Sequence, residues 1–296
     1  MILVVGASGT LGRQLVPLLT EAGHRVRALT RKPSRAGLHD TPGVEVVTGD
    51  LRDPESLRAA MRGVTSVISA SHAITGSGGG ASARVDDAGQ RALIAAARDA
   101  GVTHFTFISV LGASATHPID FWRTKWAIEG AVRASGIPHA IIRPSAFMDF
   151  HAYELIGKAV LRGKRVVLFG AGDRPRNFVA AADVARLVVR VLAEARDENV
   201  TLEVDGPEDL SSMDVVRTFA RVAGREAKVT HLPIGMARAL ARLVRPLHEG
   251  VARVLQAAVH GETVEEPYAP DALLARFPMP LTRLEEWVRA RAATIR

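Results

Sequence analysis

The chain has 296 residues, of which 47% are hydrophobic and 23% charged, and it contains no cysteine. The lack of cysteine excludes disulfides, thiolate chemistry and cysteine metal sites, and we expect no metal site. The net charge is +7, yet all but five of the 38 basic residues are arginines scattered along the chain. We interpret this charge as a compositional bias and do not expect nucleic acid as the ligand.

The length suits one large α/β domain or one domain with a smaller lobe. The first predicted strand begins at residue 2, so we expect no leader peptide. No uncharged apolar run approaches the ~20 residues that a membrane span requires. These features predict a cytoplasmic protein without integral membrane contact, and they leave open whether it forms a homodimer.

The amino terminus combines a strand, a glycine turn and a helix. Residues 1–5 are an apolar run, the sequence G-A-S-G-T-L-G follows, and apolar side chains recur at helical spacing over residues 11–22. A helix amino terminus presents unpaired N–H groups and a partial positive charge, and glycines let the backbone approach phosphates closely. The motif therefore predicts a dinucleotide site contacted by Gly6, Ser8, Gly9, Thr10, Leu11 and Gly12.

The end of the second predicted strand, residues 25–30, indicates which dinucleotide binds. An NAD-preferring site carries Asp or Glu there to bond the ribose 2′-hydroxyl, whereas this chain has Arg31 and Lys32. No carboxylate repels a 2′-phosphate, and the Arg31 guanidinium can bind one through two hydrogen bonds. We therefore predict NADP(H) as the cofactor, the alternative being two solvated charges at a strand end.

Short apolar runs continue the alternation of strands and helices. Further strands are predicted at residues 44–47, 66–70, 103–109, 166–170, 200–204 and 229–233, and another ends at Arg143-Pro144. The pattern is typical of an α/β fold with a doubly wound parallel Rossmann sheet, for which we expect the strand order 3-2-1-4-5-6-7, with 166–170 as the seventh strand. Residues 1–150 are the predicted dinucleotide-binding domain, joined by 176–196, and 151–296 mainly a smaller substrate-binding and lid lobe.

Residues 121–144 carry a second set of motifs. Phe121-Trp-Arg-Thr-Lys125 has the lysine of the Tyr-x-x-x-Lys motif of short-chain dehydrogenases, with phenylalanine at the tyrosine position. Lys125 and Glu129 then form Lys-x-x-x-Glu, followed by Ser-Gly-Ile and a predicted strand that ends in Arg143-Pro144. Together with the G-x-x-G-x-x-G turn, these motifs resemble the NmrA-like atypical short-chain dehydrogenase/reductases over nearly the whole chain.

The resemblance implies roles for several further residues. Lys125 would bond the nicotinamide ribose, Asp50 would accept a hydrogen bond from the adenine amino group, and Leu51 would pack on the adenine ring. Alternatively, Asp50 caps its own turn. For Glu129 the alternative is a side-chain pair on the surface of the helix. The remaining cofactor contacts would come from Ser69, Ala70, Ser109, Pro144, Ala146 and Phe147.

Phe121 removes the usual proton donor, because a phenyl ring has no exchangeable proton. The chain has only two tyrosines, and neither lies one turn before Lys125. His151 and Tyr153 are the plausible proton donors nearest in sequence to the predicted nicotinamide site, so they join Lys125 as candidate catalytic residues. Their alternative is a place on the polar rim of the substrate lobe.

Residues 235–259 are basic and amphipathic, with a break at Pro246. Such helices lie on membranes or cover apolar pockets, and the resemblance favours a lid over the substrate. We therefore predict an oxidoreductase that transfers hydride from NADPH to a small apolar substrate: a conjugated carbonyl compound, quinone or enone. These acceptors delocalise negative charge, so the missing tyrosine is tolerable. The alternative is a non-catalytic regulator that binds NADP(H) and senses its redox state.

Overall fold

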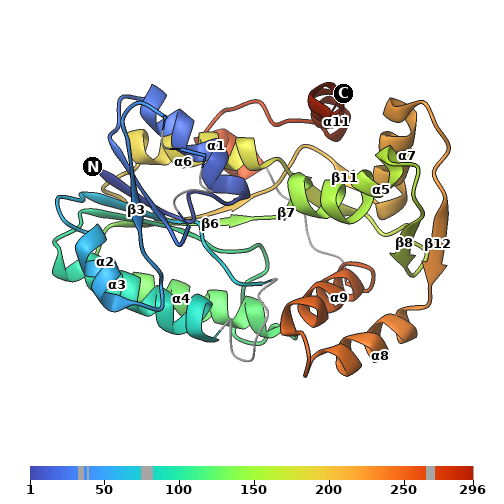
Figure 1. Cartoon of the computed structure of the whole chain (residues 1–296), viewed down its shortest axis with the longest axis horizontal. Helices are drawn as coiled ribbons and strands as arrows, with labels where there is room; N and C mark the ends of the chain where they lie inside the picture. The colour runs from blue at the N-terminus through green and yellow to red at the C-terminus, as the bar shows by residue number, and fades with distance from the viewer. Residues whose placement is uncertain (33–36, 39, 75–82, 265–270, 296) are drawn as a thin grey trace. The chain divides into compact units, whose positions relative to one another are not determined.

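A computed structural model describes residues 1–32, 37–38, 40–74, 83–264 and 271–295. The chain divides into two compact units (Figure 1), the first containing Met1–Gly76, Gly80–Arg143 and Val184–Glu203. The second contains Pro144–Asp183 and Val204–Arg296. The chain thus enters the second unit at Pro144 rather than after residue 150. It returns at Val184 rather than 176, because the strand at 176–179 pairs within the second unit.

The first unit is built on a seven-stranded sheet of order β10-β6-β5-β4-β1-β2-β3. Neighbouring strands from β3 to β6 pair in parallel, so that Val5 lies beside both Leu29 and Ser69. The doubly wound Rossmann sheet is therefore confirmed. The strands are β1 (Ile2–Val5), β2 (Val26–Thr30), β3 (Val44–Thr48), β4 (Ser66–Ser69), β5 (His104–Ile108), β6 (His139–Pro144) and β10 (Val200–Val204).

The predicted seventh strand was wrong. The strand at the edge beside β6 is β10, whereas β8 (Val166–Phe169) pairs in parallel with β12 (Val229–Leu232) in a two-stranded sheet of the second unit. Both β8 and β10 are short apolar runs, and local pattern reports which residues favour a strand without reporting the partner strand. Pairing with β6 is a long-range choice that the local pattern leaves undetermined.

Helices cover both faces of the sheet in the first unit. Figure 1 shows α1 and α6 on one face and α2, α3 and α4 on the other. Their packing with the strands buries a core that includes Leu3, Leu57, Leu93, Phe105, Phe107 and Ile128. The helices are α1 (Thr10–Glu21), α2 (Pro54–Ala60), the π-helix η2 (Ala83–Gly89), α3 (Gln90–Asp99), α4 (Asp120–Ala134) and α6 (Ala181–Glu194).

The second unit has its own core, centred on Phe178, Phe219 and Val215. A three-stranded sheet joins β7 (Ala146–Phe147), β9 (Arg176–Val179) and β11 (Asp209–Leu210). Among the described residues, no helix is long and apolar enough to cross a membrane. The helices are η3 (a π-helix, Met148–Gly157), α5 (Lys158–Leu161), α7 (Ser212–Ala223), α8 (Ile234–Val244), α9 (Glu249–Gly261), α10 (Asp271–Arg276) and α11 (Leu284–Ile295).

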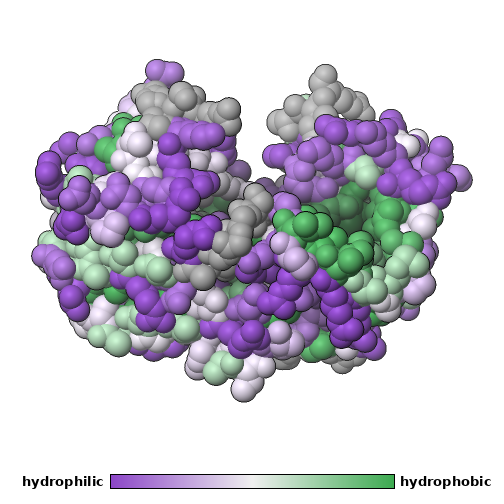
Figure 2. Space-filling view, turned by 60° about the horizontal axis from the view of Figure 1, so that its bottom comes forward, coloured by the Kyte–Doolittle hydropathy of each residue, from purple (hydrophilic) through white to green (hydrophobic). Residues whose placement is uncertain are grey.

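Helix α8 and the start of α9 present hydrophobic side chains to solvent. Of the nine large hydrophobic side chains that are exposed in the described chain, five lie between Met236 and Val251. Leu243 and Leu247 are the most exposed of them, at 75% and 85%. Figure 2 shows hydrophobic surface gathered on the side of the second unit that carries α8 and α9. The break predicted at Pro246 separates the two helices, as expected.

Candidate functional site

The glycine turn joins β1, α1 and the segment after β4 at one point. Gly6 has a left-handed φ of +90°, and a Cβ there would lie 3.0 Å from backbone atoms of Ala70 and Ser71. A Cβ at Gly12 would lie 2.3 Å from the carbonyl oxygen of Gly6. Side chains at these positions would therefore push the helix and the two strand ends apart.

The amino terminus of α1 is open to a ligand. Gly9 is the N-cap, no side chain caps the helix, and its first turn contains no acidic residue. Gly9 and Thr10 are exposed and Ser8 is half-buried, while Leu11 is buried and anchors the turn. The first-turn N–H groups thus face outward with a partial positive charge. This cradle fits the pyrophosphate of a dinucleotide, and Gly12 is the glycine that the close packing requires.

The strand order reverses between β1 and β4, which is where ligands bind in open α/β sheets. The segment after β4 is anchored there by buried polar groups. Ser69 Oγ donates to Gln90 Oε1 at 2.7 Å, and Gln90 Nε2 donates to Ser71 Oγ at 3.2 Å. The Ala70 N–H donates to the carbonyl of Val5 at 2.9 Å. These hydrogen bonds hold the segment after β4 beside the end of β1.

Lys125 is buried on α4, with only 3% of its surface exposed. Its Nζ donates to the carbonyl oxygen of Ile108, at the end of β5, over 2.8 Å. Burial lowers the pKa of Lys125 to about 8, against the opposing charges of Asp86 and Glu129. The ammonium is thus fixed close to the carboxyl edge of the sheet, where it can donate further hydrogen bonds.

Among the residues that the structure describes, two aromatic rings lie close to this ammonium. Its Nζ lies 4.6 Å from the ring centre of Phe107 and 5.6 Å from that of Phe121. Such ring faces attract a cation and offset part of the cost of burying it. Phe121 is itself buried. The structure therefore places the non-ionisable ring of Phe121 one helical turn before Lys125 on α4.

Glu129 is fully buried, so the helix-surface alternative for this residue was wrong. Its carboxylate accepts hydrogen bonds from Ser109 Oγ at 2.6 Å, from Arg143 at 2.7 and 2.9 Å, and from Arg133 at 3.0 Å. Burial alone would raise the pKa of Glu129, but the bonds from Arg143 and Ser109 outweigh it and lower the pKa. The carboxylate ties α4, which carries Lys125, to β5 and β6.

The residues predicted to contact the adenosine half lie in the first unit. Arg31 and Lys32 are exposed directly after β2. Asp50 forms a two-point ion pair with Arg52, with distances of 2.5 and 3.0 Å, and this hydrogen bonding lowers the pKa of Asp50. Leu51 is buried in the core of the first unit. The Asp50 carboxylate is thus engaged in its own turn, and its contact with adenine stays a prediction.

The remaining predicted site residues are at the end of β6 or in the second unit. Pro144 ends β6, and Ala146 and Phe147 form β7, which pairs with β9. His151 lies on η3 with its ring 5.1 Å from that of Phe150. Tyr153 is buried in the second core, 6.0 Å from the Trp287 ring and with the Arg291 guanidinium 4.8 Å from its own ring. This packing gives Tyr153 a structural role, and its catalytic role stays a prediction.

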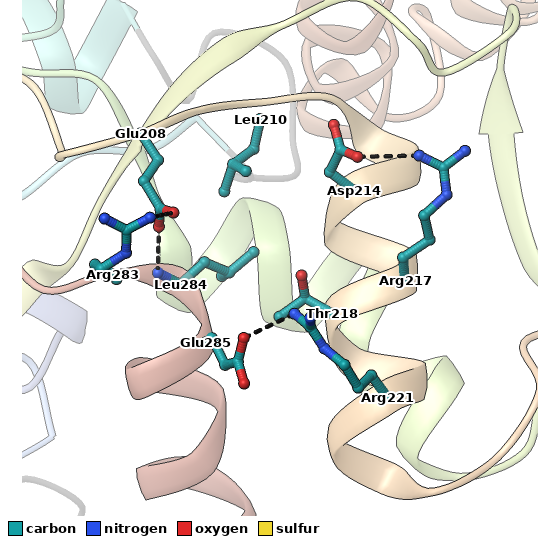
Figure 3. A pocket seen from close by; sticks show the side chains of 9 residues that line it. All are labelled: Glu208, Leu210, Asp214, Arg217, Thr218, Arg221, Arg283, Leu284 and Glu285. Atoms are coloured by element: carbon teal, nitrogen blue, oxygen red, sulfur yellow. Dashed lines mark hydrogen bonds and ion pairs between the residues drawn. The ribbon is translucent and has the colours of Figure 1, made fainter.

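An open groove of about 560 Å³ lies in the second unit between α7 and the start of α11 (Figure 3). Its arginines are each engaged by a carboxylate of the same groove, as the dashed lines in Figure 3 show. The groove therefore offers a ligand no uncompensated charge, and we assign it a structural role. The pairs are Arg217 with Asp214 at 3.0 Å, Arg221 with Glu285 at 2.8 Å and Arg283 with Glu208 at 2.7 Å.

The model of the NmrA-like family matches residues 1–287. The chain belongs to the NmrA-like family. The NAD(P)H azoreductase of Xenophilus azovorans is 31% identical over 239 residues, covering 80% of this chain and 79% of that protein. A photosystem II assembly factor of Cyanophora paradoxa is 30% identical over 235 residues, covering 79% of this chain and 72% of that protein. Triphenylmethane reductase of Citrobacter sp., solved with NADP(H), has the same fold, with 23% identity, a TM-score of 0.78 and coverage of 99% and 100%.

In this NmrA-like protein, two residues that act on Lys125 and Glu129 were missed as site residues from sequence. Asp86 is buried and its charge acts on Lys125, while Arg143 fixes the buried Glu129. His72, after β4, lies edge-on to Phe121. Spacing alone cannot find Asp86, because η2 meets α4 only in the folded chain. The Arg-Pro motif was the available signal for Arg143.

Proposed function

We propose that this chain is an NADP(H)-dependent oxidoreductase that transfers hydride to an apolar conjugated acceptor, such as a quinone, an enone or an azo compound. The observation that carries the proposal is the buried Lys125 ammonium beside Phe121, in the same unit as the glycine turn. A site without a tyrosine hydroxyl suits acceptors whose negative charge delocalises, because these need little protonation during hydride transfer. The azoreductase relative supports a reductase of this kind.

Residues of the first unit would bind and orient the dinucleotide. The N–H groups at the start of α1, with Gly6, Gly9 and Gly12, would hold the pyrophosphate. Lys125 would donate to the nicotinamide ribose while its bond to Ile108 fixes the direction of its side chain. When bound, NADPH supplies the hydride. Phe121 and Phe107 would present an apolar wall that excludes water from the acceptor.

The substrate lobe supports an apolar acceptor. The exposed side chains between Met236 and Val251 give the second unit a hydrophobic surface of the kind that marks ligand or partner sites. Arg238, Arg242 and Arg245 accompany them on the same segment, and no carboxylate occurs between Glu226 and Glu249. We infer that this surface binds an aromatic compound that is neutral or anionic.

The proposal is tested by measuring NADPH oxidation with a panel of quinones, enones, azo dyes and aldehydes. We expect turnover with the conjugated acceptors and little with simple aldehydes, which need a proton donor. NADPH binding is measured in parallel by fluorescence titration. Tight NADPH binding without turnover of any acceptor would contradict the proposal of an oxidoreductase and support that of a non-catalytic regulator.

The regulator is the second candidate, and a specific observation favours it. The photosystem II assembly factor of Cyanophora paradoxa has 30% identity to this chain, and Phe121 lacks the proton donor of the superfamily. In this alternative, NADP(H) binding controls contact with a protein partner. Co-purification of a partner in a manner that depends on NADP(H) would distinguish it from the enzyme.

The choice of NADP(H) over NAD(H) gives a prediction for Arg31. Its exposed guanidinium follows β2 at the expected position of the 2′-phosphate. The substitution Arg31→Gln should weaken NADPH binding about tenfold, because a charge-assisted hydrogen bond contributes about 1.5 kcal/mol. NADH binding should be unchanged. Isothermal titration with both cofactors provides the measurement.

Arg62→Gln is the matched control for Arg31→Gln, because Arg62 is also an exposed arginine of the first unit and its loss changes the net charge by the same amount. We expect no change in either affinity. An equal loss of NADPH and NADH affinity in Arg31→Gln would contradict a contact with the 2′-phosphate.

A further inference from the structure

His72 stands at the crevice where the sheet order reverses. It follows β4, which ends at Ser69, by three residues, and the backbone of Ala70 and Ser71 abuts Gly6 of the glycine turn. The next residue is held firmly, because the Ala73 N–H donates to the buried Asp86 carboxylate at 2.8 Å. His72 is therefore fixed at the carboxyl edge of β4, beside the predicted dinucleotide site.

The imidazole of His72 lies next to the ring that replaces the superfamily tyrosine. The ring centres of His72 and Phe121 are 6.1 Å apart, with an edge-on angle of 75°. Phe121 is one helical turn before Lys125 on α4. A polar imidazole thus borders the region from which the tyrosine hydroxyl is missing.

The hydrogen bonds of His72 indicate which ring nitrogen carries its proton. Nδ1 accepts a hydrogen bond from the Ile74 N–H at 3.4 Å, so the neutral ring has its proton on Nε2. Within the described part of the chain, Nε2 has no hydrogen-bond partner. His72 is exposed, and desolvation of its ring followed by the charge of Lys125 lowers its pKa below the usual value. At neutral pH the ring is an uncharged donor.

We propose that His72 is a catalytic residue whose Nε2–H donates a hydrogen bond to the acceptor carbonyl oxygen, in place of the missing tyrosine hydroxyl. The inference rests on the proposed function and narrows the acceptor to carbonyl compounds, namely quinones and enones. Neutral imidazole is suited to this role because it polarises a carbonyl without giving up its own proton.

The proposed reduction balances in atoms and electrons, and the protonation state of His72 is the same before and after it. The reduced nicotinamide provides two electrons and one hydrogen as hydride, which forms a bond to the conjugated acceptor. Negative charge then develops on the carbonyl oxygen, where the Nε2–H bond strengthens. Solvent water supplies the second proton when the reduced acceptor leaves the site, so that the products are the oxidised dinucleotide, the reduced acceptor and hydroxide. The imidazole keeps its Nε2 proton throughout.

The test compares His72→Phe with His72→Gln. His72→Phe keeps a ring of similar size and loses the donor, so we expect kcat with a quinone or enone to fall about tenfold, with NADPH affinity unchanged within twofold. His72→Gln places an N–H donor near the position of Nε2 and should recover most of this loss. Thermal unfolding of both variants verifies that each is folded.

Nitrogen NMR of ¹⁵N-histidine-labelled protein provides a readout that is independent of activity. We expect the His72 signal, assigned by its absence in His72→Gln, to show a neutral ring protonated at Nε2 at pH 7. A ring protonated at Nδ1, or unchanged kcat in a folded His72→Phe, would overturn the inference alone. A wild-type protein that binds NADPH and reduces no acceptor would overturn the proposed function, and the inference with it.

Discussion

We expect Lys125→Met to lose at least 100-fold in the rate of acceptor reduction while the folded protein becomes more stable. The activity falls because methionine cannot donate to the nicotinamide ribose, which leaves the reacting ring unpositioned. The stability rises because Lys125 is 3% exposed and its charge is costly to bury. Few substitutions at a proposed active site separate the two effects so clearly.

The stability gain follows from the pKa of Lys125. Lowering this pKa from 10.5 to about 8 corresponds to about 3 kcal/mol of destabilisation at neutral pH. Methionine fills a similar volume and removes that cost, but it loses the hydrogen bond to Ile108, worth about 1 kcal/mol. We therefore expect the free energy of unfolding at pH 7 to rise by about 2 kcal/mol.

The lowered pKa of Lys125 also makes the free energy of unfolding depend on pH. Because the folded-state pKa of Lys125 lies below its unfolded value, the unfolded chain binds this proton more tightly. The destabilisation is fully present below pH 8 and is relieved as the pH rises from about 8 to 10.5. Urea unfolding at pH 7 and pH 10 should show the advantage of Lys125→Met shrinking.

Lys158→Met is the control for the lysine substitution. Lys158 pairs with Glu154 at 2.7 Å on a partly exposed surface of the second unit. We expect changes below about 0.5 kcal/mol and no change in NADPH oxidation. If Lys125→Met were instead less stable than the wild type by more than 1 kcal/mol, the favourable contacts of the Lys125 ammonium would outweigh the cost of its desolvation.

Glu129→Ala should destabilise the fold by about 3 to 4 kcal/mol, because it removes the shared acceptor of Ser109, Arg143 and Arg133. The half-buried Arg143 would keep only its bond to Glu203, at 3.1 Å, and the buried Ser109 hydroxyl would lose its acceptor. The loss of a nearby negative charge should also lower the pKa of Lys125 further. Chemical denaturation at pH 7 measures the first effect.

Glu203→Ala is a matched control, since Glu203 bonds the same arginine from a side chain that is 54% exposed. We expect a cost below about 1 kcal/mol. The contrast isolates burial, because both variants remove one carboxylate from Arg143. Equal costs for Glu129→Ala and Glu203→Ala would show that the buried network does not hold α4 in place.

Local features of the sequence predicted the dinucleotide unit well. The strand, glycine turn and helix over residues 1–22 depend on contacts between near neighbours, and all three formed where the pattern indicated. Helix α2 also begins through a near-neighbour contact, since the Asp53 carboxylate accepts a hydrogen bond from the Glu55 N–H. Motif spacing also identified the family, which the match over residues 1–287 confirms.

The seventh strand, the burial of Glu129 and the core position of Tyr153 were decided by tertiary structure. Periodicity reports that a residue has a buried face, but not which distant segment covers it. Glu129 illustrates this. Its i,i+4 spacing to Lys125 is compatible with a pair on the helix surface, whereas in the structure its buried carboxylate accepts a hydrogen bond from Arg143, fourteen residues further along the chain.

The sequence by itself determined that the chain begins with a dinucleotide fold, that Arg31 stands where an NAD site has a carboxylate, and that Phe121 precedes Lys125 by one turn. Only the tertiary structure decided what surrounds Lys125. It brought His72, Asp86 and Phe107 from three other elements to α4. The physical reason is that the pKa of a buried ammonium depends on its desolvation and its neighbours in space, which a linear sequence does not specify.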